Sequence, residues 1–405
     1  MGSLMFTTWS GISALAFVAV AALLVGVVLV LGYVGRLRWL ISHRSRATPG
    51  PPTEWPSVDV IVPVYNERQL VEAKLRNLAA LDYPRERVRF WIVDGGSDDG
   101  TPERAEQGAR EDDRFTLIRY GSPNKVWQLS SVLKRGRADW VLVTDADATL
   151  PAETLRRMIT EGAGSRPPEP PWASSPTPVL AVGSSVRPVG AHPLERLYWG
   201  LADWLRLCES RCGCASIVTG PCYLFRRDLL DGFPEDVVAD DVHVALAASA
   251  RGGEVRFVEL RVEESRCPRS LSALYRHKVR KADAYLREVF RFLPRWSQMN
   301  PRGREVFAWR AAQLVVIPPL SLLGVAAGLA WIASVDLVGS STALAVAGGS
   351  LGAYAMARRT ALDALLVLPL VFLLSVVLWV ALLKHPFSSQ TANYEKIAPS
   401  PTDTL

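Results

Sequence analysis

The chain has 405 residues, a formal net charge of +6 and a mean hydropathy of +0.13. Hydrophobic residues make up 49% of it and charged residues 21%, a balance that argues against a wholly soluble protein. The two classes are segregated, because the apolar residues gather towards the two ends of the sequence and the charged residues fill the middle. The length allows more than one domain.

Much of the positive excess lies in Arg266–Arg310, beside the C-terminal apolar segments. A basic belt next to a membrane is expected to meet anionic lipid headgroups. No nucleic-acid recognition motif accompanies the charge, so we expect membrane lipids and no nucleic acid among the partners. The odd number of cysteines argues against a complete disulfide framework, and their spacing matches a metal cluster only loosely, so free buried thiols are expected. These cysteines are Cys208, Cys212, Cys214, Cys222 and Cys267.

The N-terminal part contains an almost unbroken apolar run, Gly11–Val34, without a charged residue. This length spans a bilayer as a helix and is too long for a signal-peptide core. Arginines follow it directly at positions 36, 38, 44 and 46, whereas the preceding side is uncharged. By the positive-inside rule, we expect the N-terminus outside and the following domain in the cytoplasm.

Strand-like and helix-like segments then alternate as far as residue 147. Short apolar runs predict strands, and apolar residues at helical spacing predict helices between them. The alternation predicts an α/β fold with a mostly parallel sheet and helices on both faces. The strands are expected at Val58–Pro63, Val88–Val93, Phe115–Tyr120 and Trp140–Thr144. One helix is expected to contain Val71, Leu75, Leu78 and Ala79 and to end before Tyr83-Pro84, a second to start at Thr101-Pro102, and a third to follow Lys125 and Gln128 and reach Arg135.

The apolar run that begins at Trp140 ends abruptly in two carboxylates, Asp145 and Asp147. In open α/β sheets, ligands bind beyond the carboxyl ends of the strands. Two neighbouring carboxylates repel each other and attract a hard cation such as Mg²⁺ or Mn²⁺, which usually also binds a substrate phosphate. The pattern indicates a metal–diphosphate site, with an acidic turn after a strand as the alternative.

The next part begins with Gly162–Pro178, whose Pro, Ser and Gly content predicts a flexible surface insertion. A strand is expected at Val179–Val186 and a helix at Leu194–Leu207. Thr219–Arg227 predicts a turn that leads into a short strand.

A second acidic pair, Asp240 and Asp241, opens a helix that runs to Ala250. The helix dipole alone would explain acids at that position. Leu271–Phe292 predicts a basic amphipathic helix that can lie on the membrane surface.

The C-terminal part holds three more apolar runs. Ala311–Val335 and Leu362–Leu383 predict membrane spans, and Leu337–Ala357 predicts a weaker, Ala- and Gly-rich one. Four spans would place the C-terminal tail outside, whereas a re-entrant third segment would leave it in the cytoplasm.

The order of these features resembles that of the membrane-bound family 2 glycosyltransferases, which include the cellulose, chitin and hyaluronan synthases. The resemblance covers roughly residues 56–300. It rests on Pro63-Val64-Tyr65-Asn66-Glu67, Asp94 with Asp99-Gly100-Thr101, Lys125, Asp145-Ala146-Asp147, Gly220-Pro221, Asp240-Asp241, and then a basic helix and membrane spans.

The resemblance implies a GT-A fold and an inverting transfer from a nucleotide sugar, most often a UDP-sugar. By matching position, Tyr65, Glu67 and Asp94 would hold uracil and ribose, and Lys125 would lie near the nucleotide. Asp145 would contact the nucleotide and share in the metal site, and Asp147 would ligate the Mg²⁺ or Mn²⁺ that bridges the diphosphate. Gly220, Pro221, Cys222 and Asp240 would lie on the acceptor side, and Asp241 would be the general base.

One departure from the family pattern concerns the helix after the base. Polymerising members carry Gln-x-x-Arg-Trp, where this chain has His277-Lys278-Val279-Arg280-Lys281. Arg280 can still pair with a diphosphate. Lys281 replaces the tryptophan that stacks on the acceptor sugar, so we expect a non-processive enzyme. His277 either replaces the glutamine as a hydrogen-bonding group or is an exposed helix residue.

The sequence therefore predicts a multi-pass membrane enzyme with a cytoplasmic catalytic domain. It would transfer a sugar to a saccharide or lipid acceptor in the synthesis of a surface polysaccharide or glycolipid. The alternative is a non-catalytic subunit that binds a nucleotide sugar or helps to export a polymer, although such a subunit has no need of Asp147 and Asp241. The expected division is a transmembrane helix at 1–35, a linker at 36–56, the GT-A domain at 57–265, basic interface helices at 266–310, three spans at 311–384 and a tail at 385–405.

Overall fold

A computed structural model describes residues 2–44, 49–164, 177–334 and 361–387. Its centre is an eight-stranded sheet in the order β3-β2-β1-β4-β7-β6-β8-β5. The strands are β1 Val58–Val64, β2 Val88–Asp94, β3 Phe115–Arg119, β4 Trp140–Thr144, β5 Ala148–Thr149, β6 Val179–Pro188, β7 Cys222–Arg226 and β8 Glu254–Glu264.

The first four strands are parallel to one another, as the sequence predicts. β7 runs antiparallel to β4 and β6, and the short β5 runs antiparallel to β8, so the sheet as a whole is mixed. The sequence did not predict β8, which pairs in parallel with β6 across two register irregularities. The predicted strands at 58–63, 88–93, 115–120 and 179–186 are all present, with ends that shift by one or two residues.

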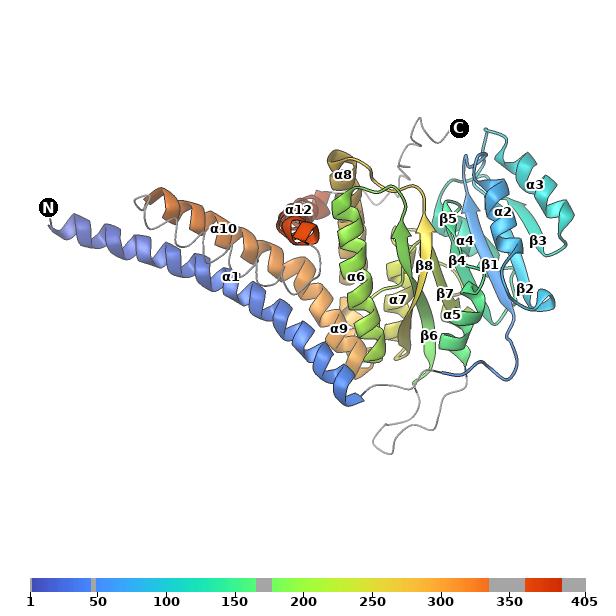
Figure 1. Ribbon diagram of the computed structural model, residues 1–405, viewed down its shortest axis with the longest axis horizontal. Coiled ribbons are helices and arrows are strands. Elements are labelled where there is room, and N and C mark those ends of the chain that lie inside the picture. Colours follow the sequence, from blue (N-terminus) through green and yellow to red (C-terminus); the bar gives the residue numbers. More distant parts are fainter. Residues whose placement is uncertain (1, 45–48, 165–176, 335–360, 388–405) are drawn as a thin grey trace.

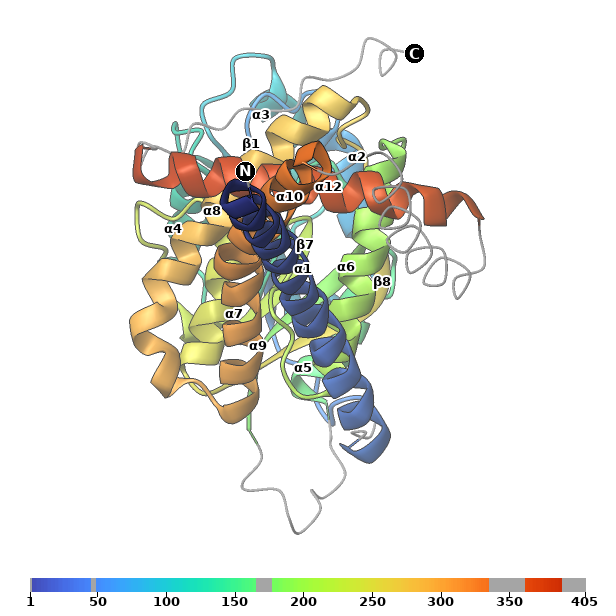
Figure 2. The same ribbon diagram turned by 90° about the vertical axis from the view of Figure 1, so that its left-hand side faces the viewer.

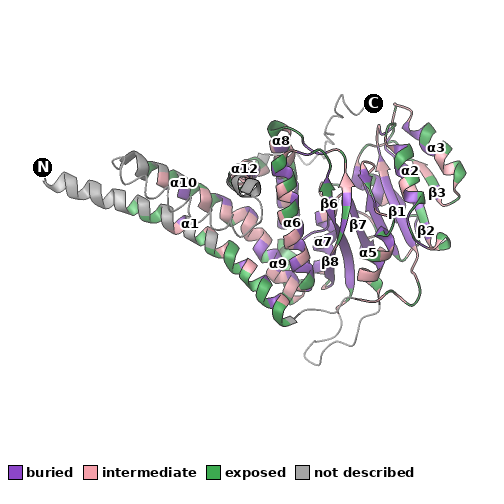
Figure 3. Ribbon diagram, in the orientation of Figure 1, coloured by how far each residue is buried: buried purple, intermediate pink, exposed green. Residues whose placement is uncertain are grey.

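Helices cover both faces of the sheet (Figure 1). On one face, α2 Val71–Ala79, α3 Thr101–Glu111 and α5 Thr154–Ala163 share a core with Val60, Phe90 and Leu142 of the strands. On the other face, α4 Lys125–Leu133, α6 Pro193–Arg211, α7 Asp240–Ala250 and α8 Leu271–Phe292 share a core with Ile61, Val141 and Tyr223. The central strands are buried while the outer sides of α2 and α3 are exposed (Figure 3).

The helices that flank this domain lie to one side of it. α1 is continuous from Gly2 to Arg44 and contains the predicted span Gly11–Val34. It packs along α10 Ile317–Ser334, which continues α9 Pro301–Ala311 through a π-helical turn at Ala312–Val316. α12 Ala361–Lys384 packs on α6 and α8 and lies crosswise to α1 and α10 (Figure 2).

Within the described residues, one helix, Pro301–Gly328, has the length and apolar composition needed to cross a membrane. Leu370–Lys384 is a shorter apolar helix. The predicted third span, Leu337–Ala357, lies outside the described residues, as do most of the insertion at 162–178 and most of the tail. The number of membrane spans stays a prediction.

Glu209, on α6, joins the domain built on the sheet to the flanking helices. Its side chain is fully buried and accepts hydrogen bonds from the Tyr33 hydroxyl of α1 at 2.9 Å and from the Ser216 amide at 2.8 Å. The guanidinium of Arg310, on α9, donates to the same carboxylate at 3.3 Å. Tyr33 also stacks on Trp309, with 4.4 Å between ring centroids. One buried carboxylate therefore holds together three helices that are far apart in sequence.

We expect Glu209→Ala to lower the free energy of unfolding by roughly 3–5 kcal/mol, because it leaves the Arg310 charge buried without this partner. Thermal unfolding of the purified protein in detergent, followed by circular dichroism, measures the change. The control is Glu72→Ala on α2, which removes a solvent-exposed partner of Arg76 and should cost about 0.5 kcal/mol or less. Equal stability of the two variants would contradict a structural role for Glu209.

Candidate active site

The carboxylates predicted from the sequence gather where β4 ends. β4 is buried along its whole length, and the chain leaves the sheet at Asp145. The Pro221 carbonyl accepts hydrogen bonds from the Thr144 hydroxyl at 2.9 Å and from the Asp145 amide at 3.3 Å. The segment Asp145–Asp147, called the acidic loop below, is therefore adjacent to the Gly220-Pro221 turn, although the two are far apart in the sequence.

Gly220 is the point at which the two acidic pairs meet. A Cβ atom built on it would lie 3.5 Å from Oδ2 of Asp241 and 4.0 Å from Oδ2 of Asp145. The two carboxylates therefore approach the same residue from the two acidic pairs.

Lys125, at the start of α4, bridges the two acidic pairs. Its Nζ lies 2.8 Å from Oδ1 of Asp145 and 3.1 Å from Oδ2 of Asp240. Asp240 is buried and also accepts a hydrogen bond from the Tyr223 hydroxyl. Asp240 is thus held as a paired structural carboxylate, and of the two neighbouring acids Asp241 is the one available for chemistry.

Asp241 lines the same cavity, and the Val242 amide donates to its Oδ1 at 2.9 Å. Burial and then the negative charge of Asp240 raise the pKa of Asp241. A carboxylate with a raised pKa is a better proton acceptor than an ordinary one, which suits a general base.

Asp147 follows Asp145 by two residues and lines the same cavity. Burial and then the charge of Asp145 raise the pKa of Asp147 to about 6. Glu264, at the end of β8, also faces this region, and burial raises the pKa of its carboxyl to about 7. A divalent cation would relieve the repulsion between these groups, and hard oxygen ligands suit Mg²⁺ or Mn²⁺. The described residues contain no group of three His, Cys, Asp or Glu side chains placed to hold a metal. Divalent ions such as Mg²⁺ are commonly held by one or two carboxylates together with substrate phosphates and water, and Asp145 and Asp147 offer such a pair of carboxylates.

Lys74, on α2, is hydrogen-bonded to both ends of the acidic loop, and it was not predicted from the sequence. Its side chain is buried, and Nζ donates to the Thr144 hydroxyl at 2.8 Å and to the Ala148 carbonyl at 2.5 Å. These two bonds bracket Asp145 and Asp147, so Lys74 fixes both ends of the loop that carries them. Burial lowers the pKa of the Lys74 ammonium to about 8.

The loops after β1 and β2 form the opposite end of the site. The Asp94 carboxylate accepts hydrogen bonds from the Gly96 amide at 3.0 Å and from the hydroxyl and amide of Ser97. Asp94 holds this loop and does not line the cavity, whereas Tyr65 and Glu67 do. The guanidinium of Arg266 pairs with Oε1 of Glu67 at 2.7 Å, which brings the segment after β8 over the β1 loop.

These groups line one cavity of about 620 Å³. Of the residues predicted for donor, acceptor and metal, all but Asp94 and Cys222 line it; Cys222 is buried behind the Gly220 turn. The cavity also reaches the flanking helices, where apolar side chains of α1, α10 and α12 form its wall. Sequence reasoning missed several lining residues, namely Gln128, Trp199, Glu264, Arg266 and Lys278.

The part of α8 that departs from the family pattern faces this cavity too. Lys278 is buried, pairs with Oε2 of Glu195 at 2.6 Å and lies 3.3 Å from the centroid of the Tyr198 ring. Lys281 lies 5.4 Å from the centroid of the Trp199 ring. Burial and then the neighbouring cations, Lys281 first, hold the pKa of His277 well below its usual range, so its imidazole is neutral.

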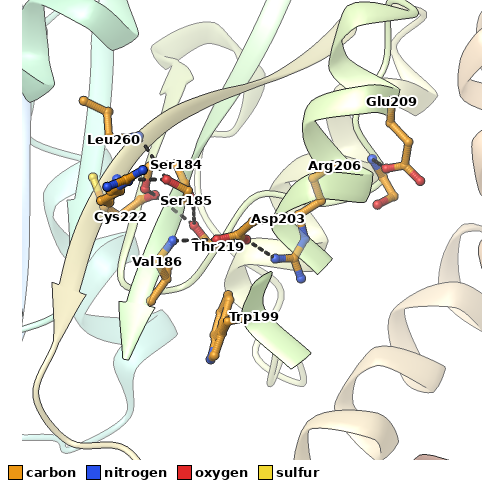
Figure 4. A network of polar contacts seen from close by, with 12 residues as sticks. Ser184, Ser185, Val186, Trp199, Asp203, Arg206, Glu209, Thr219, Cys222 and Leu260 are labelled. Carbon is orange, nitrogen blue, oxygen red and sulfur yellow. Dashed lines mark hydrogen bonds and ion pairs between the residues drawn. The ribbon is translucent and has the colours of Figure 1, made fainter. Parts of the chain in front are cut away.

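A polar network joins the Gly220 turn to the sheet (Figure 4). The Thr219 hydroxyl donates to the Ser184 carbonyl at 2.7 Å, and the Ser184 hydroxyl donates to the Cys222 carbonyl at 3.0 Å. Two residues further along β6, the Val186 amide donates to Asp203 of α6, which also pairs with Arg206 at 2.8 Å. The turn is bonded to β6 on both sides of Gly220, and β6 is in turn bonded to α6, so the position of Gly220 is fixed.

Comparison with known proteins places these residues in a family context. A family model described as glycosyl transferase family 2 matches residues 59–162. An N-acetylglucosaminyltransferase of Rhizobium leguminosarum bv. viciae is 26% identical over 353 residues, which cover 78% of this chain and 78% of that protein. A UDP-forming cellulose synthase catalytic subunit of Komagataeibacter sucrofermentans is 26% identical over 255 residues, 59% of this chain but 32% of that one. The chain thus spans about a third of the cellulose synthase subunit.

A solved structure matches over nearly the whole chain. The mannosyltransferase PcManGT from Pyrobaculum calidifontis, in complex with GDP-Man and Mn²⁺, is 26% identical with a TM-score of 0.72. The match covers 92% of this chain and 99% of that one, which shows that the two share a mixed α/β fold of the GT-A type.

The buried position of Lys74 makes stability depend on pH. Its folded pKa of about 8 lies below the ordinary value of 10.5, so between these pH values the unfolded chain binds the proton and the folded protein does not. Stability rises with pH where the unfolded state binds more protons. Relative to Lys74→Met, the wild type should therefore gain about 2 kcal/mol of unfolding free energy from about pH 7 to about pH 9.5.

Chemical denaturation in chelator-containing buffer at both pH values measures this difference. The matched control is Lys134→Met at the exposed end of α4, for which the difference from wild type should not change with pH. A pH-independent effect of Lys74→Met would contradict the depressed pKa.

Proposed function

Because the chain is a family 2 glycosyltransferase, we propose that it transfers a sugar, with inversion, from a nucleotide sugar to an acceptor bound between the Gly220 turn and α8. The observation that carries this proposal is the convergence of Asp145 and Asp241 on the space above Gly220. Donor-side and acceptor-side groups meet there, and Lys125 bridges the two sides.

The donor would lie along the loops after β1, β2 and β4. Tyr65 and Glu67 line the cavity where the base and ribose would bind, and Asp94 would act by holding its loop. We expect UDP as the nucleotide, as in the UDP-forming cellulose synthase relative; the mannosyltransferase of Pyrobaculum calidifontis was solved with GDP-Man, so both nucleotides belong in an assay. Arg280, which lines the cavity, would pair with the diphosphate.

Asp147 and Asp145 would hold Mg²⁺ or Mn²⁺. A bound divalent ion stabilises the negative charge that develops on the leaving diphosphate. Lys125 adds a fixed positive charge on the same side, because its ammonium contacts Asp145 in a partly buried position.

Asp241 would act as the general base. The acceptor hydroxyl attacks the anomeric carbon from the face opposite the diphosphate, and Asp241 takes the hydroxyl proton as the new carbon–oxygen bond forms. The bond between the anomeric carbon and the diphosphate oxygen breaks, and the nucleoside diphosphate leaves with the electron pair. Asp240 would support the reaction by holding Lys125 beside Asp145.

The surroundings of the site favour a membrane-bound enzyme. The flanking helices expose large apolar side chains, among them Phe17 at 74%, Leu31 at 57% and Phe372 at 69%, which suit a lipid environment. Together with the arginines that follow the apolar run Gly11–Val34, this supports a cytoplasmic catalytic domain at the inner membrane face. Similarity to enzymes favours catalysis over the alternative of a non-catalytic binding or export subunit. The domain division expected from the sequence is part of the proposal.

The product is expected to be short. Lys281 occupies the position of the tryptophan that polymerising relatives use to hold a growing chain, and an ammonium offers no flat apolar face to a sugar. The acceptor is a saccharide or a lipid-linked group at a cytoplasmic surface, consistent with synthesis of a surface polysaccharide or glycolipid.

Removal of the metal ligand tests the donor side. Asp147→Ala should abolish release of nucleotide from the donor, and excess chelator should do the same to the wild type, because the leaving diphosphate loses its counter-charge. The measurement is nucleotide release from a panel of UDP- and GDP-sugars by purified membranes. Asp113→Ala, an exposed acid paired with Arg85, should retain full activity. Full wild-type activity in chelator would refute the metal proposal.

Removal of the base tests the acceptor side. Asp241→Asn keeps the shape of the side chain but cannot accept a proton, so the transfer rate should fall by about 10²–10⁴. UDP affinity, measured by calorimetry, should stay unchanged because the donor-side groups remain. Asp231→Asn, at an exposed position, is the matched control. An unchanged transfer rate in Asp241→Asn would remove the base assignment.

A further inference from the structure

The walls of the cavity differ in chemistry from one side to the other. One wall is the face of α8 that carries His277 and Lys281, next to Asp241. The facing wall is apolar and comes from the flanking helices, with Val30 of α1, Ile317 of α10 and Leu370, Leu374 and Leu378 of α12. A free sugar would fill the polar side alone and leave the apolar wall uncovered.

The polar wall contains two groups that could bind an anion, Lys281 and His277. Lys281 has an exposed side chain and makes no ion pair within salt-bridge distance in the part of the chain that the structure describes, whereas the neighbouring Lys278 is neutralised by Glu195. One helical turn before Lys281, on the same face, Nδ1 of His277 is buried without a hydrogen-bond partner among the described residues. A neutral imidazole can donate one hydrogen bond and an ammonium three, and phosphate oxygens accept both.

A simpler role for Lys281 would be to neutralise nearby acids. Its charge lowers the pKa of both Asp241 and Glu264, so it faces both groups. This role leaves the unpartnered nitrogen of His277 and the apolar wall without a function, whereas one amphiphilic anion would use all three features.

We propose that the acceptor is a lipid-linked sugar phosphate, with its phosphate held by Lys281 and His277, its chain along the apolar wall of α10 and α12, and its sugar hydroxyl at Asp241. The inference rests on the proposed function and specifies its acceptor. The reacting bonds are those of the transfer described above, and the phosphate of the acceptor takes no part in them. The lysine that replaces the polymerase tryptophan thus becomes the group that selects a charged acceptor.

Binding of dodecyl phosphate to the full-length protein in amphipol, measured by calorimetry, tests the proposal without a choice of sugar. Dodecyl phosphate should bind at least about tenfold more tightly than the neutral dodecyl glycerol ether, since a charge-assisted contact contributes about 1.5–3 kcal/mol. Lys281→Gln should remove this preference. Arg276→Gln, an exposed neighbour on α8 that does not line the cavity, should keep it.

The other outcomes separate the alternatives. Methyl phosphate that binds as tightly as dodecyl phosphate would overturn the lipid chain in favour of a soluble sugar phosphate. Equal affinity for the phosphate and the neutral ether, or an unchanged preference in Lys281→Gln, would overturn the phosphate site and leave Lys281 as a partner of Asp241 and Glu264. UDP affinity is measured in the same samples. A wild-type protein that does not bind UDP would count against the proposed function. If UDP binds but dodecyl phosphate shows no preference, only the proposal about the acceptor is wrong.

Discussion

The candidate active site is shaped by the electrostatic repulsion between carboxylates that the fold brings together. Asp145, Asp147, Asp240, Asp241 and Glu264 come from three separate parts of the chain and face one cavity. Cations from separate elements surround them: Lys125 lies between Asp145 and Asp240, Lys74 holds the loop that carries Asp145 and Asp147, and Lys281 faces Asp241 and Glu264. These cations differ in how closely they contact the acids: Lys125 forms ion pairs with Asp145 and Asp240, whereas Asp147 and Asp241 have no ion pair among the described residues.

A buried carboxylate also links the catalytic domain to its flanking helices. Glu209 is a single buried carboxylate that takes donors from α1, α9 and the loop after α6. The cavity wall that these helices provide is therefore part of the folded domain and not a loose attachment. Its apolar surface lines the same cavity as Asp145 and Asp241, so the shape of that cavity depends on how the helices pack.

Much of the fold could be predicted from the sequence because its signals are local. β1, β2 and β4 are short apolar runs that end in polar loops, and α2 shows helical spacing of Val71, Leu75 and Leu78. β8 was missed although it is eleven residues long, since its charged residues hide the alternation. Lys74 could not be recognised either, because a lysine on an amphipathic helix ordinarily faces solvent, and its burial depends on the position of the β4 loop. The family resemblance, in contrast, implied contacts with the ligands for Asp94 and Cys222. In the structure, Asp94 accepts hydrogen bonds from its own loop, and Cys222 is buried behind the Gly220 turn.

The five cysteines, all free and four of them buried, have a practical consequence for chemical modification. The nucleophile in thiol alkylation is the thiolate, and burial raises the pKa of Cys212 and Cys214 to about 11 and that of Cys222 to about 12. Burial also raises the pKa of Cys208 and Cys267. At neutral pH the thiolate fraction at a pKa of 11 is only about 10⁻⁴. The five natural cysteines should therefore react very slowly with maleimides at neutral pH. A single cysteine introduced at an exposed position could then be labelled with a fluorophore or spin label without prior removal of the natural ones.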